Sequence, residues 1–519
     1  MVYAAFEKAP AYGAKLASAD LAAAKASPGV KDVVVLDGVG VNPASLVNGV
    51  AVIADSWWNA HQGRRKLNAK WQAGPSAGQS SAEFAKQAAA LATQPPTLPI
   101  RKDGDFASAH KAAAKKVEAA YYFPFISHVT LEPQNCTAQF KDGKLEIWAP
   151  SQNPGQGRTM IVRDLGIKTE DITLHLTRSG GGFGRRLSND YMIEAAAIAQ
   201  KTGGAPVKLI WSREDDMAHD FYRPLGYHNF SAGLDKDGNL VAFRDHYVTV
   251  GTGGRFAASA DLAAGEFPGG AVPHLEFAAS IMESAVPTGP LRAPRSNGHS
   301  FAFQCFLDEL ALAAGRDPIE FRIALLRAMP EPAPTPPAAP GAPPVSPPFS
   351  PARMIAVMEK VKAVSGWGRT VEKGTGLGCA FYFSHMGYFA EVVEVRVDAA
   401  SKIKVEKVWV AGDIGKHIIN PAGAANQVEG GIIDGIGAAL HQQITIADGA
   451  TVQKNFNQYP MIRMPESPVA VEAHWVLSDN APTGLGEPMM PPVLPALGNA
   501  IFAATGKRVR NLPIDLTKA

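Results

Sequence analysis

The spacing of apolar and polar side chains along the chain predicts alternating strands and helices. Residues 172–177 alternate between apolar and polar types, which indicates a strand with one buried face. Residues 190–204 carry an alanine-rich helical pattern that ends in two glycines, and residues 207–211 form an apolar run typical of another strand. Asp-Gly pairs at 142–143 and 237–238 separate apolar stretches, so each predicts a hairpin turn. The pattern is that of a mixed α/β protein.

Changes in composition divide the 519 residues into three structured units and two connections. Residues 1–72 are predicted to form a small α/β unit, and residues 73–105, rich in Ala, Gln, Ser, Gly and Pro, an exposed connection with one short helix. Residues 106–328 form a first larger domain. The stretch 329–350 is too rich in proline to pack, so we expect a solvated linker there. Residues 351–519 form a second large α/β domain.

The overall composition argues against several classes of protein. A net charge of +2 gives no strong field for nucleic acid or a membrane surface, and no apolar run reaches the length of a bilayer span. The first residues lack the basic and then apolar pattern of an export signal. The cysteines, Cys136, Cys305 and Cys379, are too few for four-cysteine ligation of an iron–sulfur cluster. Any redox centre must be held in another way.

Residues 178–190, with the sequence RSGGGFGRRLSND, place four glycines around one phenylalanine between a predicted strand and a predicted helix. Glycine allows another molecule to approach the backbone closely, and the free N–H groups at a helix start favour an anion. A tight turn without a ligand is the simpler alternative. The pattern matches neither GxxxxGK[ST] nor a good GxGxxG, which argues against a phosphate loop or a dinucleotide fold. Arg185 and Arg186 could contact either a phosphate or solvent.

Glu487 is the only ionisable residue between Asp479 and Lys507, and its neighbours are Gly, Pro, Met and Leu. A carboxyl group with few polar neighbours loses hydration, which would raise its pKa and make it a better general base near neutral pH. The alternative is a structural glutamate at a helix start, where the helix dipole favours negative charge. From spacing alone, this structural alternative is the simpler one.

A set of long stretches carries a resemblance that covers nearly the whole chain. They are HVTLEPQNCTA, SQNPGQGR, GGGFGRRLSNDY, GPLRAPRSNGHSFAFQCFLDELA, DIGKHIINP, NQVEGGIIDGIGAAL and GEPMMPPVLPALGNAIFAATGKRVRNLP. In this order they resemble the molybdenum-binding large subunit of the xanthine dehydrogenase and aldehyde oxidase family. The resemblance is strongest to the isoquinoline 1-oxidoreductase beta subunit and related periplasmic aldehyde dehydrogenases.

The resemblance implies a fold and a cofactor. It implies a small hammerhead-type α/β domain at residues 1–72, incomplete at its start, followed by two larger mixed α/β molybdopterin-binding domains. The implied cofactor is molybdopterin in its cytosine dinucleotide form, with the molybdenum held through the pterin and with no iron–sulfur cluster or flavin in this chain. The implied partners are a small [2Fe–2S] subunit and a small-molecule substrate, either an aldehyde or an N-heterocycle.

The resemblance also assigns roles to single residues. Cofactor contacts fall on Gln152, Gly181, Gly182, Phe183, Gly184, Gln427 and Gly486. Among these, Gln152 would hydrogen-bond the apical oxo group of the metal. Arg292 would face the substrate, with a structural salt bridge as the alternative. Glu487 would be the general base that takes a proton from the attacking hydroxyl, so that oxygen from water enters the substrate.

Two departures from the family pattern qualify these expectations. Purine-oxidising members carry a glutamate where this chain has Leu187, which argues against purine recognition. Relatives in the isoquinoline branch begin with a further segment, often with an export signal, that adds a glycine-glutamine loop to the cofactor pocket. We therefore expect weak cofactor binding by this chain alone, restored by such a segment on the same or a separate polypeptide.

Two competing functions remain from the sequence. The chain is either the catalytic molybdenum subunit or a truncated, non-catalytic remnant that keeps the fold and partner binding. A flavin or nicotinamide dehydrogenase ranks last, because a proper dinucleotide fingerprint is missing. The sequence does not define the substrate, the final electron acceptor, the cellular location or the oligomeric state.

Overall fold

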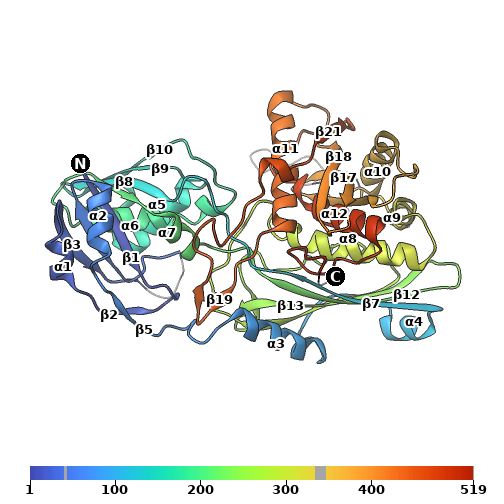
Figure 1. Ribbon diagram of the computed structural model, residues 1–519, viewed down its shortest axis with the longest axis horizontal. Coiled ribbons are helices and arrows are strands. Elements are labelled where there is room, and N and C mark those ends of the chain that lie inside the picture. Colours follow the sequence, from blue (N-terminus) through green and yellow to red (C-terminus); the bar gives the residue numbers. More distant parts are fainter. Residues whose placement is uncertain (40–43, 334–346, 518–519) are drawn as a thin grey trace.

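The computed structural model describes residues 1–39, 44–333 and 347–517, which form two lobes side by side (Figure 1). The first lobe is built on a seven-stranded sheet, and the second on a six-stranded and a four-stranded sheet. The mixed α/β fold expected from the sequence is confirmed. Most of the proline-rich linker predicted at 329–350 lies outside the described residues.

The first lobe contains one mixed sheet, in which strands from residues 2–54 pair with strands from residues 135–210. Its strands, in spatial order, are β10 (Ile172–Leu176), β9 (Lys144–Ala149), β8 (Asn135–Lys141), β11 (Val207–Ile210), β1 (Val2–Lys8), β4 (Gly49–Ala54) and β3 (Val30–Leu36). The helices here are α1 (Leu21–Lys25), α2 (Trp57–Arg64), α5 (Pro154–Leu165), α6 (Asp190–Ala199) and α7 (Arg213–Ala218). Helix α6 is buried along its whole length, so it forms the centre of this core.

The predicted unit 1–72 does not close a sheet of its own. Strand β1 pairs in parallel with β11, so Val2 lies opposite Val207. Its other edge pairs with β4, whose residues are all buried. Strand β1 thus lies inside the sheet with a partner on each edge, which satisfies its backbone N–H and C=O groups, and unpaired groups in a core are costly. The boundary placed at residue 72 therefore does not separate two sheets.

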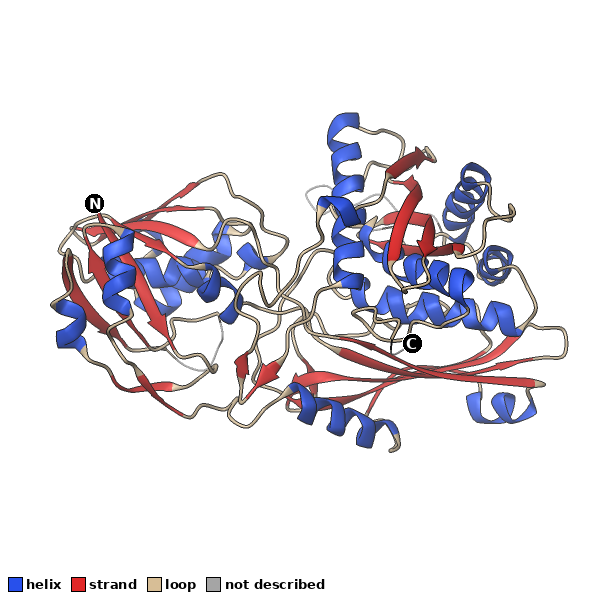
Figure 2. Cartoon of the chain, viewed as in Figure 1, coloured by secondary structure: helices blue, strands red, loops and turns tan. Residues whose placement is uncertain are grey.

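The second lobe stacks helices between its two sheets (Figure 2). The larger sheet has the order β6 (Leu98–Asp103), β15 (His274–Glu283), β13 (Leu240–Thr252), β12 (Gly226–Leu234) and β7 (Lys115–Phe123), with β14 (Arg255–Phe256) paired to β13. The smaller sheet has the order β16 (Thr375–Ser384), β17 (Gly387–Val397), β18 (Ile403–Asp413) and β21 (Ala470–Trp475). The helices are α3 (Ser81–Ala92), α4 (Phe106–Ala112), α8 (Ser296–Ala313), α9 (Pro318–Arg327), α10 (Pro351–Ser365), α11 (Pro421–Leu440) and α12 (Met490–Thr505).

Short elements complete the chain. Two small ribbons pair β2 (Lys15–Ser18) with β5 (Lys70–Gln72) and β19 (Ile446–Ala447) with β20 (Ala450–Thr451). Single 3-10 turns occur at Thr169–Asp171, Arg185–Leu187 and Met464–Glu466. Among the described residues, no helix combines the length and the apolar character that a bilayer crossing requires.

The elements read from the hydrophobic pattern are confirmed in the glycine-rich region. Strand β10, helix α6 and strand β11 follow in the expected order, and the two Asp-Gly pairs lie at the turns of β8–β9 and β12–β13. The connection predicted at 73–105 is wrong in one respect. It contains β6, an edge strand paired with β15, as well as the helix α3. Pro99 within β6 weakens the strand signal, since proline is tolerated only at sheet edges.

Helix α12 lies directly on strand β16 because two glycines of the strand carry no side chain there. A Cβ added at Gly378 would overlap Ala500 N and Ala496 O, and one at Gly376 would overlap Ala500 O. The other face of α12 packs against α8. This close approach involves the second half of α12, and Glu487 and Pro488 precede the other end of the same helix.

We expect Gly378→Ala to destabilise the second lobe by about 1–3 kcal/mol or more, because the helix backbone must move to admit the methyl group. The measurement is the midpoint of thermal unfolding of the full chain. Gly155→Ala is the matched control, since a Cβ at Gly155 meets no atom within 4 Å and this residue lies in a helix. An unchanged midpoint for Gly378→Ala would show that α12 adjusts freely.

Candidate active site

The residues singled out in the sequence converge on one cavity of about 510 Å³ where the two lobes meet. The lining includes Gln152, Phe183, Gly184 and Leu187 from the first lobe and Arg292, Gln427, Gly486 and Glu487 from the second. Gly181 and Gly182 lie beside this lining and not in it. The cavity thus combines segments that are far apart in the sequence.

The glycine-rich loop is shaped by contacts with the other lobe. Gly184 has φ +106°, and a Cβ there would overlap the carbonyl oxygen of Pro290. Phe183 also has a positive φ, and its carbonyl accepts the N–H of Arg292 at 2.9 Å. A residue other than glycine at position 184 would push the two lobes apart.

The two arginines after the glycines face neither phosphate nor solvent, so both alternatives considered for them are wrong. Arg185 is 1% exposed and forms a two-bond contact with Asp190 at 2.8 and 2.9 Å. Arg186 is fully buried and donates to Gly181 O and to the Glu132 carboxylate. Asp190 also occupies the start of α6, so the anion expected at that helix start is the protein's own carboxylate.

Gln152 presents a hydrogen-bond donor to the cavity. Its side-chain oxygen accepts the backbone N–H groups of Gly184 at 3.1 Å and Arg186 at 3.3 Å. Because the oxygen is used in this way, the amide nitrogen is turned away from the loop. This nitrogen has no hydrogen-bond partner among the described residues, so it is free to donate to a group in the cavity.

Arg292 connects three segments of the second lobe. Its Nε donates to Gly486 O at 2.8 Å, and one terminal nitrogen donates to the side-chain oxygen of Gln427 at 3.1 Å. The other terminal nitrogen lies 3.5 Å from Asp434. Burial raises the pKa of Asp434, and the nearby Arg292 acts in the opposite direction. The structural salt bridge considered for Arg292 is therefore present, and its substrate contact stays a prediction.

Both carboxylate oxygens of Glu487 have partners. Oε1 accepts the backbone N–H of Ala293 at 3.1 Å, and Oε2 lies 3.1 Å from Nε2 of His385. The side chain is 35% exposed, toward the cavity. The expected lack of polar neighbours is wrong, because both partners come from segments that are distant in the sequence. His385 is a site residue that sequence reasoning missed.

A second cavity of about 490 Å³ adjoins the first, and Pro294 lines both. Its walls carry several aromatic rings, which are Phe267, Phe349, Phe381, Tyr382 and Phe383. Glu266 lies among them and accepts the Tyr382 hydroxyl at 2.6 Å. Burial raises the pKa of Glu266 from 4.5 to about 7, although the Tyr382 hydrogen bond acts to lower it.

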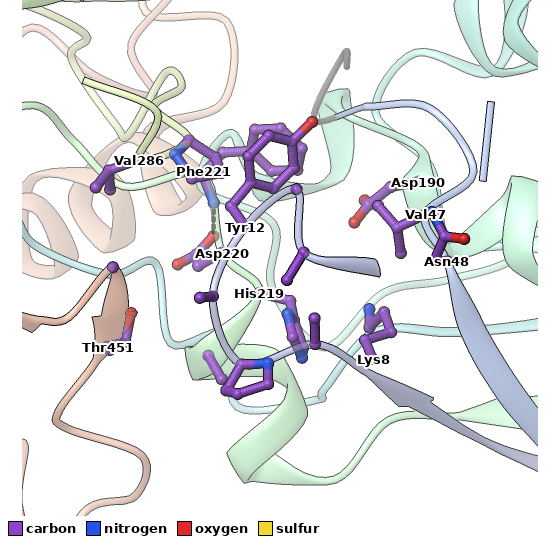
Figure 3. Close-up of a pocket in the computed structure, with 18 of the residues that line it drawn as sticks. Lys8, Tyr12, Val47, Asn48, Asp190, His219, Asp220, Phe221, Val286 and Thr451 are labelled. Atoms are coloured by element: carbon purple, nitrogen blue, oxygen red, sulfur yellow. Dashed lines mark hydrogen bonds between the residues drawn. The ribbon is translucent and has the colours of Figure 1, made fainter. Parts of the chain in front are cut away.

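A third, smaller cavity of about 140 Å³ lies apart from these residues, beside the segment that follows β1 (Figure 3). Lys8 pairs with Glu194 at 2.8 Å, and its ammonium lies 3.2 Å from the centre of the Trp211 ring. Burial raises the pKa of Glu194, and Lys8 opposes the shift. His219 lines the same cavity, and burial, with help from Lys8, holds its pKa well below the ordinary value. These groups form a buried charge network inside the first lobe.

The first cavity fits the reactive end of a polar, oxygen-bearing cofactor. Gln152 supplies an available donor, and a Cβ at Gly486 would meet no atom within 4 Å, so the backbone there is open to a ligand. In the part of the chain that the structure describes, no group of three or more His, Cys, Asp or Glu side chains is placed to hold a metal ion directly.

Comparison with protein families identifies two matching regions. Models of the molybdopterin cofactor-binding domain match residues 92–325 and residues 350–468, which together make up more than half of the chain. The first match contains Gln152, the glycine-rich loop and Arg292, and the second contains Gln427. Glu487 lies beyond both.

Curated relatives are similar over nearly the whole chain. The isoquinoline 1-oxidoreductase subunit beta of Brevundimonas diminuta is 29% identical, covering 99% of this chain and 64% of that protein. A membrane-bound aldehyde dehydrogenase (pyrroloquinoline-quinone) of Gluconacetobacter polyoxogenes is 28% identical, covering 97% of this chain and 66% of that protein. The chain thus spans about two thirds of the length of these relatives.

Solved structures share the fold. Quinoline 2-oxidoreductase from Pseudomonas putida 86 has a TM-score of 0.76 at 13% identity, covering 99% of this chain and 93% of that one. The CO dehydrogenase of Oligotropha carboxidovorans has a TM-score of 0.77 at 14% identity, covering 98% and 91%. At such low identity this likeness concerns the arrangement of helices and strands.

Glu266 predicts a pH dependence of stability. Its pKa is about 7 in the folded protein against 4.5 ordinarily, so the folded protein keeps a proton that the unfolded chain releases in this window. Stability therefore falls as pH rises from 4.5 to 7, by up to about 3 kcal/mol. We expect Glu266→Gln to remove this fall, as measured by unfolding midpoints across the window.

Tyr382→Phe is the companion variant. It removes the donor that lowers the pKa of Glu266, so the fall in stability with rising pH should continue to a higher pH. If the unfolding midpoints of the wild type and Glu266→Gln changed with pH in the same way, the fall in stability would not be due to Glu266.

Proposed function

The chain belongs to the xanthine dehydrogenase and aldehyde oxidase family, and from that premise we propose that it is the molybdenum-binding subunit of a hydroxylase. The proposed reaction inserts a water-derived oxygen at the carbon of an aldehyde or an N-heteroaromatic ring. The observation that supports it best is the meeting of Gln152, Arg292 and Glu487 around one cavity. These side chains come from three distant segments, so their meeting is a consequence of the fold.

Residues on opposite sides of the cavity would contact different parts of the cofactor. Gln152 would donate its free amide N–H to an oxo group, because its own oxygen is already held by the glycine-rich loop. Gln427 and the open backbone at Gly486 would contact the cofactor from the other side. When bound, molybdopterin, which we propose to be the cytosine dinucleotide form, supplies the oxidant that accepts two electrons from the substrate carbon.

Glu487 is the proposed general base. One carboxylate oxygen accepts the proton of the water-derived hydroxyl that attacks the electrophilic carbon. The Ala293 N–H holds Oε1, and the Arg292 contact with Gly486 O holds the preceding residue, so the carboxylate keeps its direction. Leu187 makes the facing wall apolar, which supports an aldehyde or a heteroaromatic ring over a purine as substrate.

Electron transfer needs a partner in this proposal. Cys136, Cys305 and Cys379 are all buried and unpaired with one another, and burial raises the pKa of each thiol. Thiols of this kind are poor metal ligands, because the thiolate is the ligating form. A separate small [2Fe–2S] subunit would therefore carry the electrons away from the cofactor.

We expect Glu487→Gln to lower turnover roughly 10²- to 10⁴-fold, the usual cost of losing a general base. Molybdenum content should not change, because Gln152, Gln427 and the glycine-rich loop are untouched. The measurements are turnover and metal content of the assembled enzyme with aldehyde and N-heterocycle substrates.

Glu466→Gln serves as the control for Glu487→Gln. It removes a glutamate that also lies 3.1 Å from a histidine nitrogen, that of His441, and that is outside the cavity. Turnover of Glu487→Gln equal to that of the control would remove Glu487 from its role. Negligible turnover in a molybdenum-loaded wild type would favour the non-catalytic alternative.

We also expect the purified chain to contain neither an iron–sulfur cluster nor flavin, and to pass no electrons to an acceptor by itself. The reasons are the small number and the burial of its cysteines, and the missing flavin fingerprint in the sequence. An absorption spectrum and an iron assay check this expectation. Stoichiometric iron with a cluster spectrum would contradict it.

A further inference from the structure

The turn between β16 and β17 holds His385 in an unusual backbone conformation. Ser384 pairs with Gly387, so His385 and Met386 form a two-residue hairpin loop. Both have a positive φ, +50° and +63°, a geometry that Asn and Gly usually supply. Such strain persists only where the surroundings enforce it, and it is concentrated at functional sites.

The surroundings that enforce this conformation include the residue after Glu487. A Cβ added at Gly387 would lie 2.7 and 2.8 Å from the ring carbons of Pro488. The end of the hairpin therefore packs directly on the chain that carries Glu487. Because Gly387 packs against the ring of Pro488, the spacing between His385 and the Glu487 carboxylate is set by the fold.

A chain of polar contacts extends from Glu487 through His385 into the second cavity. Nε2 of His385 lies 3.1 Å from Oε2 of Glu487, and Nδ1 lies 2.8 Å from Oγ of Ser384. The Ser384 hydroxyl in turn donates to Oγ of Ser296 at 3.1 Å. All but Glu487 line the second cavity, and the His385 side chain is 39% exposed there. Nε2 of the imidazole thus faces Glu487, and Nδ1 faces Ser384 at the second cavity.

We propose that His385 is a positioning residue for Glu487 and the group that receives its proton. This inference rests on the proposed role of Glu487 as general base. Between turnovers, the protonated Glu487 gives its proton to Nε2 of His385, because the neutral ring carries its own proton on Nδ1, and this leaves a carboxylate beside an imidazolium. The imidazolium then loses one proton to water in the second cavity, and exchange with that water returns the ring to its Nδ1–H form, so that both groups regain their starting state. Glu487 needs no direct path to solvent.

The first experiment observes the imidazole directly and requires no turnover. In the full chain labelled with ¹⁵N-histidine, NMR signals of the His385 ring are assigned by their loss in His385→Gln. We expect the proton of the neutral ring on Nδ1 in the wild type, because Ser384 donates its own hydroxyl proton to Ser296 and accepts at Nδ1. The signals should change in Glu487→Gln and stay the same in Glu466→Gln, which removes the partner of His441. Unchanged signals in Glu487→Gln would overturn the inference.

The second experiment measures activity in the molybdenum-loaded assembly. We expect His385→Ala to lower kcat roughly 10- to 100-fold, in line with the loss of a polar contact to a charged group. KM and molybdenum content should stay within about 2-fold of the wild type, because His385 acts through Glu487 and not on the substrate. Imidazole added to the solution should restore activity, since the vacated position borders a cavity of about 490 Å³.

His175→Ala is the matched control. His175 lies 2.9 Å from Glu146, both side chains are 44% exposed, and neither belongs to the cavities described. Its loss should leave kcat unchanged and imidazole without effect. Full kcat in His385→Ala, or a loss that imidazole does not reverse, would overturn the inference. A loaded wild type without turnover would reject the proposed function and, with it, the proton transfer, whereas unchanged NMR signals in Glu487→Gln would reject the role of His385 alone.

Discussion

The buried guanidinium of Arg292 is the contact on which the geometry of the cavity depends. It is carried by the chain before α8, and it has partners on the helix α11 and on the loop before α12. A buried charge without such partners would be costly, so the three segments are held in one relative position. The loop that carries Glu487 is therefore held in place by the contact of Arg292 with Gly486. The backbone of Arg292 also binds the glycine-rich loop, which couples the second lobe to the first.

The cavity exists only because two lobes contribute to it. The first lobe supplies a donor fixed by its own loop, and the second supplies the carboxylate and the arginine. Sites between packed units are a common place for cofactors, since each unit remains a rigid support while the surface between them stays open. Gly184 sets how closely the two supports approach at Pro290. Small residues at this contact therefore determine the shape of the site as much as the polar side chains do.

Local sequence patterns predicted local structure well, and long motifs predicted most of the lining of the cavity. Alternation identified β10, and the motifs identified Gln152 and Glu487, because these signals lie within a few residues. The pairing of β1 with β11 and the contact of His385 with Glu487 join distant segments, which no local pattern encodes. Burial of Arg186 was missed for the same reason, since its carboxylate partner Glu132 lies in another segment. Arg185 pairs with Asp190 only five residues away, but its burial depends on the packing of the folded lobe.

The central place of β1 has a consequence for how the protein is made. Strands β1, β4 and β3 leave the ribosome early, but the parallel partner of β1 is β11, which is synthesised much later. Contacts of such wide sequence separation form slowly, and an open strand edge can pair with the wrong chain in the interval. The first lobe can therefore complete its core only after Val207–Ile210 has emerged. A nascent chain that stalls before this point would expose an aggregation-prone edge to chaperones and proteases.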